Sequence, residues 1–196
     1  MKLITLLFLL LTFTHMNAQN IQENPLPYAE IPEAPASYTP GTVISRMIDG
    51  LGFRYHWATE GLTQEDLDYR PGNDGRTIAE TMDHLYGLSM VIVNSAKKEP
   101  RDFTVEQPTL SMAQKRKATL ENLEVASRLF RETSNLEEHK LVFIRANGRL
   151  EFPFWNNING PIEDAIWHAG QVVVLRRSAG NPINPKVNVF LGKLND

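Results

Sequence analysis

Residues 159–180 read NGPIEDAIWHAGQVVVLRRSAG, and they set the interpretation of the C-terminal part of the chain. A helix is predicted to begin at Asn159-Gly160-Pro161, because proline fits the first helical turn, where its missing N–H is not needed. The helix is expected to run to about Ser178. Gly180 then suits the residue just past the helix, and Pro182 prevents its continuation.

Three segments upstream of this stretch also carry apolar residues at i, i+3 and i+4 spacing, which predicts helices. They cover residues 41–61, 77–98 and 111–133. Two of their starts are marked by a capping box, in which a hydroxyl and a longer polar side chain bond each other's backbone N–H groups. The two capping boxes are Thr77 with Glu80, and Ser111 with Gln114.

Between the third and fourth helices the apolar period changes to two. Leu141–Arg145 and Arg149–Phe154 flank Asn147-Gly148, the dipeptide that best fits a type I′ hairpin turn. The pattern therefore predicts an all-α fold, a four-helix bundle with a small β-hairpin insertion before the last helix. We assign residues 41–196 to this domain.

The N-terminus has the layout of a secretory signal peptide. Lys2 precedes an apolar run from Leu3 to Thr14, and small or polar residues follow up to Ala18. We expect residues 1–18 to be removed and the protein to be exported to the periplasm or beyond the cell. After this cleavage we expect no stable membrane insertion. The alternative is that the segment is not cleaved and anchors the protein in the membrane. Residues 19–40 are rich in proline and predict an extended lead-in.

Composition narrows the chemistry. The chain of 196 residues contains no cysteine, which excludes disulfides, thiolate nucleophiles, cysteine metal sites and a lipoprotein anchor. Its formal net charge of −3, without a basic patch, argues against nucleic acid as a partner. A chain of this size forms one domain with a sizeable core.

Three polar residues suggest a metal site. Asp164 and His168 are spaced i, i+4, so their side chains lie on one helix face about a turn apart. His84, in the middle of the second helix, lies at the margin of the apolar arc and is expected to face inward. Two imidazoles and one carboxylate form a known set of ligands for divalent metals that leaves coordination positions open. An open position allows a bound water or substrate atom to be polarised.

Two segments resemble helices of the DinB-like (DinB/YfiT-type) four-helix-bundle superfamily. They are Thr77-Ile-Ala-Glu80 through His84-Leu85, and Asp164-Ala-Ile-Trp-His168-Ala-Gly-Gln171 with Leu175-Arg176 and Gly180 after it. The family typically shows His-x3-His-x-Gly-Gln in its last helix. The resemblance covers about Val43 to Gly180, and it implies a metal triad of one histidine from the second helix and two residues from the last, often with nickel, zinc or manganese. With the expected signal peptide, the chain would be a secreted member. The resemblance also implies a homodimer.

The chain departs from the family pattern at Asp164, which stands where the family usually has histidine. A carboxylate there would make the site more anionic and shift its preference toward Mn²⁺ or Fe²⁺. Two readings without metal stay open for Asp164: a favourable position near a helix N-terminus, and a hydrogen-bonded network with the histidines. Gln171 and His56 are candidate outer partners of the site. His139, within Glu137-Glu138-His139-Lys140, is expected to be solvated.

Two classes of function are consistent with these observations. The first is a metal-dependent enzyme acting on a small molecule, by hydrolysis or lyase-like chemistry in preference to thiol transfer. The second is a non-catalytic secreted bundle that binds a ligand or partner, in which the histidines and the aspartate form a structural polar network. The sequence identifies neither the substrate nor the metal.

Overall fold

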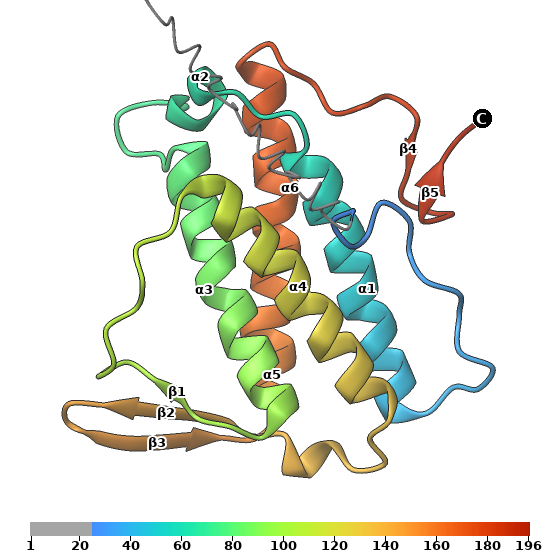
Figure 1. The fold of residues 1–196 in the computed structure, drawn as a ribbon, viewed down its shortest axis with the longest axis vertical. Coiled ribbons are helices and arrows are strands. Elements are labelled where there is room, and N and C mark those ends of the chain that lie inside the picture. Colours follow the sequence, from blue (N-terminus) through green and yellow to red (C-terminus); the bar gives the residue numbers. More distant parts are fainter. Residues whose placement is uncertain (1–24) are drawn as a thin grey trace, which may run out of the picture.

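The computed structural model describes residues 25–196, and its main body consists of four long helices that lie side by side (Figure 1). These are α1 (Pro40–Thr59), α3 (Ile78–Lys97), α4 (Met112–Arg131) and α6 (Glu163–Ser178). A short helix, α2 (Gln64–Asp68), lies between α1 and α3 in the chain. The three helices predicted upstream of the last one are confirmed, with small shifts at their ends.

The helices begin where side chains can satisfy the free backbone N–H groups. The predicted capping boxes at the starts of α3 and α4 are both present. The structure adds two more, Thr39 with Thr42 at α1 and Thr63 with Asp66 at α2. After the last turn of α6, Gly180 has a φ of 93°, as expected for the residue that ends a helix in this way.

The helices are held together by one apolar core. Each long helix contributes fully buried side chains to it, and their burial is the main source of stability in a chain without disulfides. Representative members are Ile48, Leu51 and Tyr55 from α1, Ile78 and Ile92 from α3, Leu120 and Phe130 from α4, and Ala169 and Val172 from α6.

The prediction of an all-α four-helix bundle was wrong, because two small sheets accompany the helices. β2 (Leu141–Arg145) and β3 (Gly148–Phe152) form the expected hairpin, but β1 (Arg101–Asp102) adds a parallel strand and makes a mixed three-stranded sheet. β4 (Val187–Asn188) and β5 (Lys193–Leu194) pair in the C-terminal tail. The fold is therefore mixed α and β. Strands of two residues are too short to leave an alternating pattern in the sequence.

Two local predictions also need correction. The hairpin turns at Ala146-Asn147, and neither residue has the positive φ that a type I′ turn requires. Pro161 does not start the last helix. It lies inside a π-helical turn, η2 (Ile158–Ile162), which joins the short helix α5 (Trp155–Asn157) to α6. The helical run thus begins earlier than the proline indicated.

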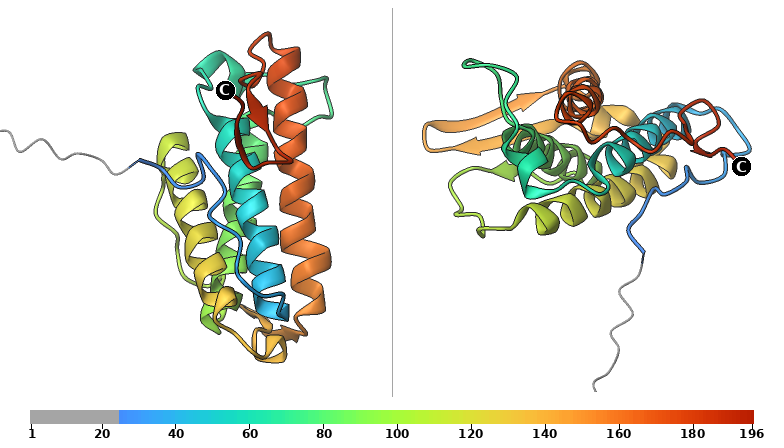
Figure 2. Two further views of the ribbon diagram at one scale, coloured as in Figure 1. Left: turned by 90° about the vertical axis from the view of Figure 1, so that its right-hand side faces the viewer. Right: turned by 90° about the horizontal axis from the view of Figure 1, so that it is seen from above.

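The segment before α1 lies along the outside of that helix (Figure 2). Tyr28 enters the core against Gly52, where an added Cβ would lie 2.4 Å from the tyrosine ring, so only glycine fits. The backbone N–H of Ile31 donates to the carbonyl of Gly192, which ties this segment to the C-terminal tail. The expected signal peptide, residues 1–18, lies outside the described residues. Within residues 25–196, no helix is long and apolar enough to cross a membrane.

A buried carboxylate fastens the segment before α1 to the helices. Asp49 of α1 is almost completely buried, and it accepts hydrogen bonds from the hydroxyls of Tyr28 and Ser127. The guanidinium of Arg131 forms an ion pair with it at 3.1 Å. Burial and the neighbouring Asp49 raise the pKa of the Tyr28 phenol, so that its hydroxyl stays protonated and donates. The network joins the lead-in, α1 and α4.

His139 gives the fold a dependence on pH, because it is buried and not solvated as the sequence suggested. Its Nδ1 donates to the carbonyl of Ser95, and its Nε2 accepts from the hydroxyl of Thr133. Burial lowers the pKa of His139 from 6.5. Since the unfolded chain then binds more protons, this contribution to stability is complete above the unfolded value and is lost as pH falls through the lower folded pKa.

We therefore expect the free energy of unfolding to fall as the solution is acidified from about pH 7 to about pH 5. Urea denaturation at several pH values would measure this decline. In His139→Gln the decline should be shallower, with a remainder from buried His56, whose pKa burial also lowers. An equally steep decline in the variant would show that His139 does not titrate with unfolding.

Candidate metal centre

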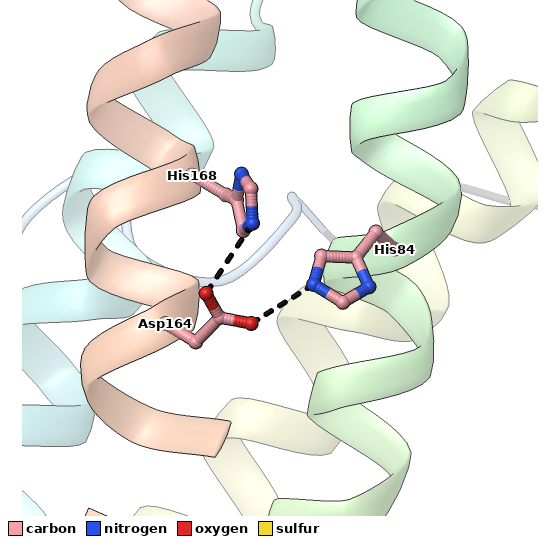
Figure 3. Close-up of side chains that lie close together, drawn as sticks. All are labelled: His84, Asp164 and His168. Atoms are coloured by element: carbon pink, nitrogen blue, oxygen red, sulfur yellow. Dashed lines mark hydrogen bonds and ion pairs between the residues drawn. The ribbon is translucent and has the colours of Figure 1, made fainter. Parts of the chain in front are cut away.

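The structure brings the three predicted ligands together on the surface between α3 and α6. His84 comes from α3, and Asp164 and His168 lie one turn apart on α6 (Figure 3). The carboxylate lies between the two rings, with Asp164 Oδ2 at 2.9 Å from His84 Nε2 and Asp164 Oδ1 at 3.3 Å from His168 Nε2. One potential ligand atom from each residue lies within 4.8 Å of the others. A single ion could contact all three.

The π-helical turn η2 sets the direction in which α6 presents this pair. A π turn inserts an extra residue into the helical repeat and so rotates the next part of the helix; such turns are frequent at functional sites. Asn157, just before η2, is fully buried and donates from Nδ2 to the hydroxyl of Ser95 on α3 at 3.1 Å. This bond fixes the start of the helical run against α3. Ala165 and Ala169 are buried on the inner side of α6, where small residues let a neighbouring helix approach.

The course of the helix decides between two readings of Asp164. Its negative charge would be favoured by the helix dipole only at a free N-terminus, where backbone N–H groups lack partners. The helical run begins at Trp155 and passes through η2 into α6 without a non-helical break, and Ile162 before α6 is itself helical. Asp164 therefore lies well inside the run. The dipole does not explain its position, which leaves a ligand or a hydrogen-bonded network.

Gln171 fixes the proton on His168. The side-chain oxygen of Gln171 lies 2.7 Å from His168 Nδ1, and an amide oxygen can only accept, so Nδ1 carries the proton. In the neutral ring Nε2 then presents a lone pair toward the carboxylate of Asp164. A lone pair and a carboxylate oxygen repel each other unless a proton or a metal ion lies between them. The donor set thus fits a cation.

The three side chains are also accessible. They are 33%, 41% and 15% exposed for His84, Asp164 and His168 respectively. The two imidazole rings meet edge to face, with centroids 4.7 Å apart, so they approach a common point from different directions. Ligands on one side and solvent on the other leave open coordination positions, which a catalytic metal needs and a closed structural site lacks.

Of the two residues predicted as outer partners of the site, Gln171 lies at the site and His56 does not. Gln171 contacts His168, as an outer partner should. His56 is buried on α1, and its Nδ1 bonds the carbonyl of Pro27 at 2.8 Å, so it holds the segment before α1 and not the metal centre. Sequence reasoning missed Asn157, because the signal for its role, a partner on α3, is not local.

Gln171 offers a test of how the site is oriented. Gln171→Ala is expected to weaken metal affinity by about tenfold, because partners of this kind fix the ring and raise its basicity. Gln171→Glu should restore the affinity, since a carboxylate also accepts from Nδ1. Isothermal titration with Zn²⁺ and Mn²⁺ would measure both variants. Equal metal affinity in Gln171→Ala and the unmodified protein would show that Gln171 does not orient His168 for metal binding.

The site is thus defined by an accessible carboxylate between two imidazoles, one of which has its far nitrogen capped by an amide. These features belong to α3 and α6. Searches against protein-family models, curated proteins and solved structures find no match to this chain.

Proposed function

We propose that this protein binds one divalent metal ion through His84, Asp164 and His168 and uses it to act on a small molecule. The observation that carries the proposal is the convergence of the three ligand atoms within 4.8 Å on an accessible surface. Zinc, nickel, manganese and iron all accept this mixture of nitrogen and oxygen ligands. Compared with a site made of histidines alone, a site with the carboxylate has a stronger preference for Mn²⁺ and Fe²⁺.

Each residue has a distinct task in this proposal. The imidazoles of His84 and His168 donate through Nε2, and Asp164 supplies negative charge that partly neutralises the ion. Gln171 keeps the proton of His168 on Nδ1, away from the ion. When bound, the metal would supply Lewis acidity, which polarises a water or a substrate heteroatom. We favour hydrolysis or lyase-like chemistry, with the protein exported as its N-terminus suggests.

Metal-dependent turnover is the test of this function. The protein is stripped with chelator, reloaded separately with Zn²⁺, Ni²⁺, Mn²⁺ or Fe²⁺, and assayed against a panel of small esters, amides and phosphoesters. Activity that needs a metal and is lost in His84→Ala supports the proposal. Glu163→Gln is the matched control, because Glu163 is an exposed carboxylate beside Asp164 that is not a ligand. If the protein shows no activity with any of the four metals, the proposal that it is an enzyme is contradicted.

A non-catalytic role has one observation in its favour. With both Nε2 atoms protonated, Asp164 would accept from His84 and His168, and the trio would link α3 to α6 without an ion. Such a network would belong to a secreted protein that binds a ligand or partner elsewhere. The free energy of unfolding in the presence of chelator distinguishes this role from metal binding. A structural network predicts that His84→Ala is less stable than the unmodified protein under these conditions, whereas a metal site predicts little difference between them.

A further inference from the structure

The three-stranded sheet ends in an unpaired strand. The strand order is β1-β2-β3, so within residues 25–196 β3 pairs on one side only. Figure 1 shows the sheet at the base of the helices with β3 as the strand farthest from them, and Figure 2 shows the hairpin projecting sideways. The free edge of β3 is therefore open to another strand, which is the situation that proteins ordinarily avoid or use for association.

The backbone groups on this free edge can be assigned. The carbonyl of Ile144 in β2 accepts from the N–H of Phe103 next to β1, so the polar backbone groups of Ile144 point away from β3. Ile144 lies opposite Arg149 in the register. Their pair is thus the kind that exchanges no hydrogen bonds, and Arg149 directs its N–H and C=O to the free edge. By the two-residue period, Glu151 does the same.

The side chains of β3 complement a second copy of the same strand. In a symmetric antiparallel pair, one residue of β3 must lie opposite itself. With Leu150 at that position, Arg149 lies opposite the partner's Glu151 and Glu151 lies opposite the partner's Arg149. Centring on Arg149 or on Glu151 would instead place like charges directly opposite each other, which is unfavourable. The alternating signs therefore select one register.

The same register joins the apolar surfaces. Leu150 and Phe152 share one face of the sheet, together with Phe143, and both are exposed. Pairing about Leu150 places the two leucines side by side and sets Phe152 beside the partner's Gly148, where an aromatic ring covers backbone that glycine leaves bare. Phe103, also exposed, lies 5.9 Å from Phe143 between ring centroids and extends this surface.

We propose that two copies of this chain associate through antiparallel pairing of their β3 strands, centred on Leu150, to form one continuous sheet. Arg149 and the partner's Glu151 would exchange both backbone hydrogen bonds of their pair, and the unlike side chains would meet across it. In a single copy, Arg149 and Glu151 form an ion pair at 2.8 Å. On association, Arg149 would pair with the Glu151 of the other copy instead, and Glu151 with the other copy's Arg149. The pairing does not depend on the metal centre.

Charge reversal tests this register. Arg149→Glu makes the edge wholly acidic and Glu151→Arg makes it wholly basic, so each variant opposes its own copy while the two variants complement each other. Sedimentation velocity over a concentration series would follow each protein alone and an equimolar mixture. Lys117→Glu is the control, because it reverses a charge in an exposed ion pair on α4, away from the sheet.

The purified protein and Lys117→Glu are expected to form a concentration-dependent dimer. Each reversal on β3 should weaken self-association by at least about tenfold, and the mixture should restore it as a heterodimer. Restoration also shows that both variants are folded. The proposal is overturned if the unmodified protein stays monomeric, if each variant alone dimerises as well as the unmodified protein, or if the mixture fails to associate.

Discussion

Replacing Asp164 with alanine is expected to lower affinity for divalent metal by at least about a hundredfold, because losing even an outer partner of a metal ligand costs about ten- to a hundredfold. The carboxylate lies between both imidazoles and provides the only negative charge among the three residues. Because Asp164 is 41% exposed, its removal should leave the free energy of unfolding of the metal-free protein within about 1 kcal/mol of its original value. Isothermal titration and urea denaturation in chelator would measure the two quantities.

Asp164→His separates a ligand from a structural network. A third imidazole at this position should retain metal binding and shift preference from Mn²⁺ toward Zn²⁺ and Ni²⁺. Glu163→Gln serves as the control in the same titrations, with unchanged affinity expected. If Asp164→His neither binds metal nor folds, the trio is a network in which the carboxylate is needed as a hydrogen-bond acceptor.

The second large effect is expected at the opposite side of the molecule, where Asp49→Ala should destabilise the fold by about 3 kcal/mol. The substitution leaves the buried hydroxyl of Tyr28 without its acceptor, removes one acceptor of the Ser127 hydroxyl, which keeps Ser45, and removes the ion partner of Arg131. Arg131 is partly exposed and can turn to solvent, which keeps the loss below that of a fully buried pair. Chemical denaturation monitored by circular dichroism would measure it.

Asp74→Asn is a matched control for this prediction, because Asp74 is an exposed carboxylate in the loop before α3 and its change should alter stability by less than about 0.5 kcal/mol. The metal affinity of Asp49→Ala should be unchanged as long as the protein is folded, since Asp49 lies on α1 and the metal centre on α3 and α6. A stability of Asp49→Ala equal to that of Asp74→Asn would contradict the role given to the buried network.

Local signals account for the elements that the sequence predicted well. Apolar spacing and the capping boxes at Thr77 and Ser111 place long helices, because both depend on residues within one or two turns. The pairing of Asp164 with His168 is equally local, being a consequence of i, i+4 geometry. The margin of the apolar arc made His84 a candidate for the third ligand, but nothing within α3 specifies what lies across from it, and the packing of α3 against α6 brings it to the pair.

Long-range packing accounts for the elements that the sequence did not predict. Strand β1 exists because Arg101 lies beside Phe143, far along the chain, and two residues carry no periodicity that would announce it. His139 sits among charged neighbours in the sequence, yet it is buried against the ring of Phe130 and bonded to Ser95. Pro161 indicated a helix start, and the π turn that contains it depends on how α5 is anchored to α3.

The most direct test of the metal centre is elemental analysis of the purified protein, prepared without chelator or an affinity tag containing histidine, beside His168→Ala. We expect close to one equivalent of a divalent transition metal in the unmodified protein and a loss of that metal in the folded variant. An unmodified protein that carries no metal and takes up neither zinc, manganese, nickel nor iron when they are added would contradict the proposal that His84, Asp164 and His168 form a metal site.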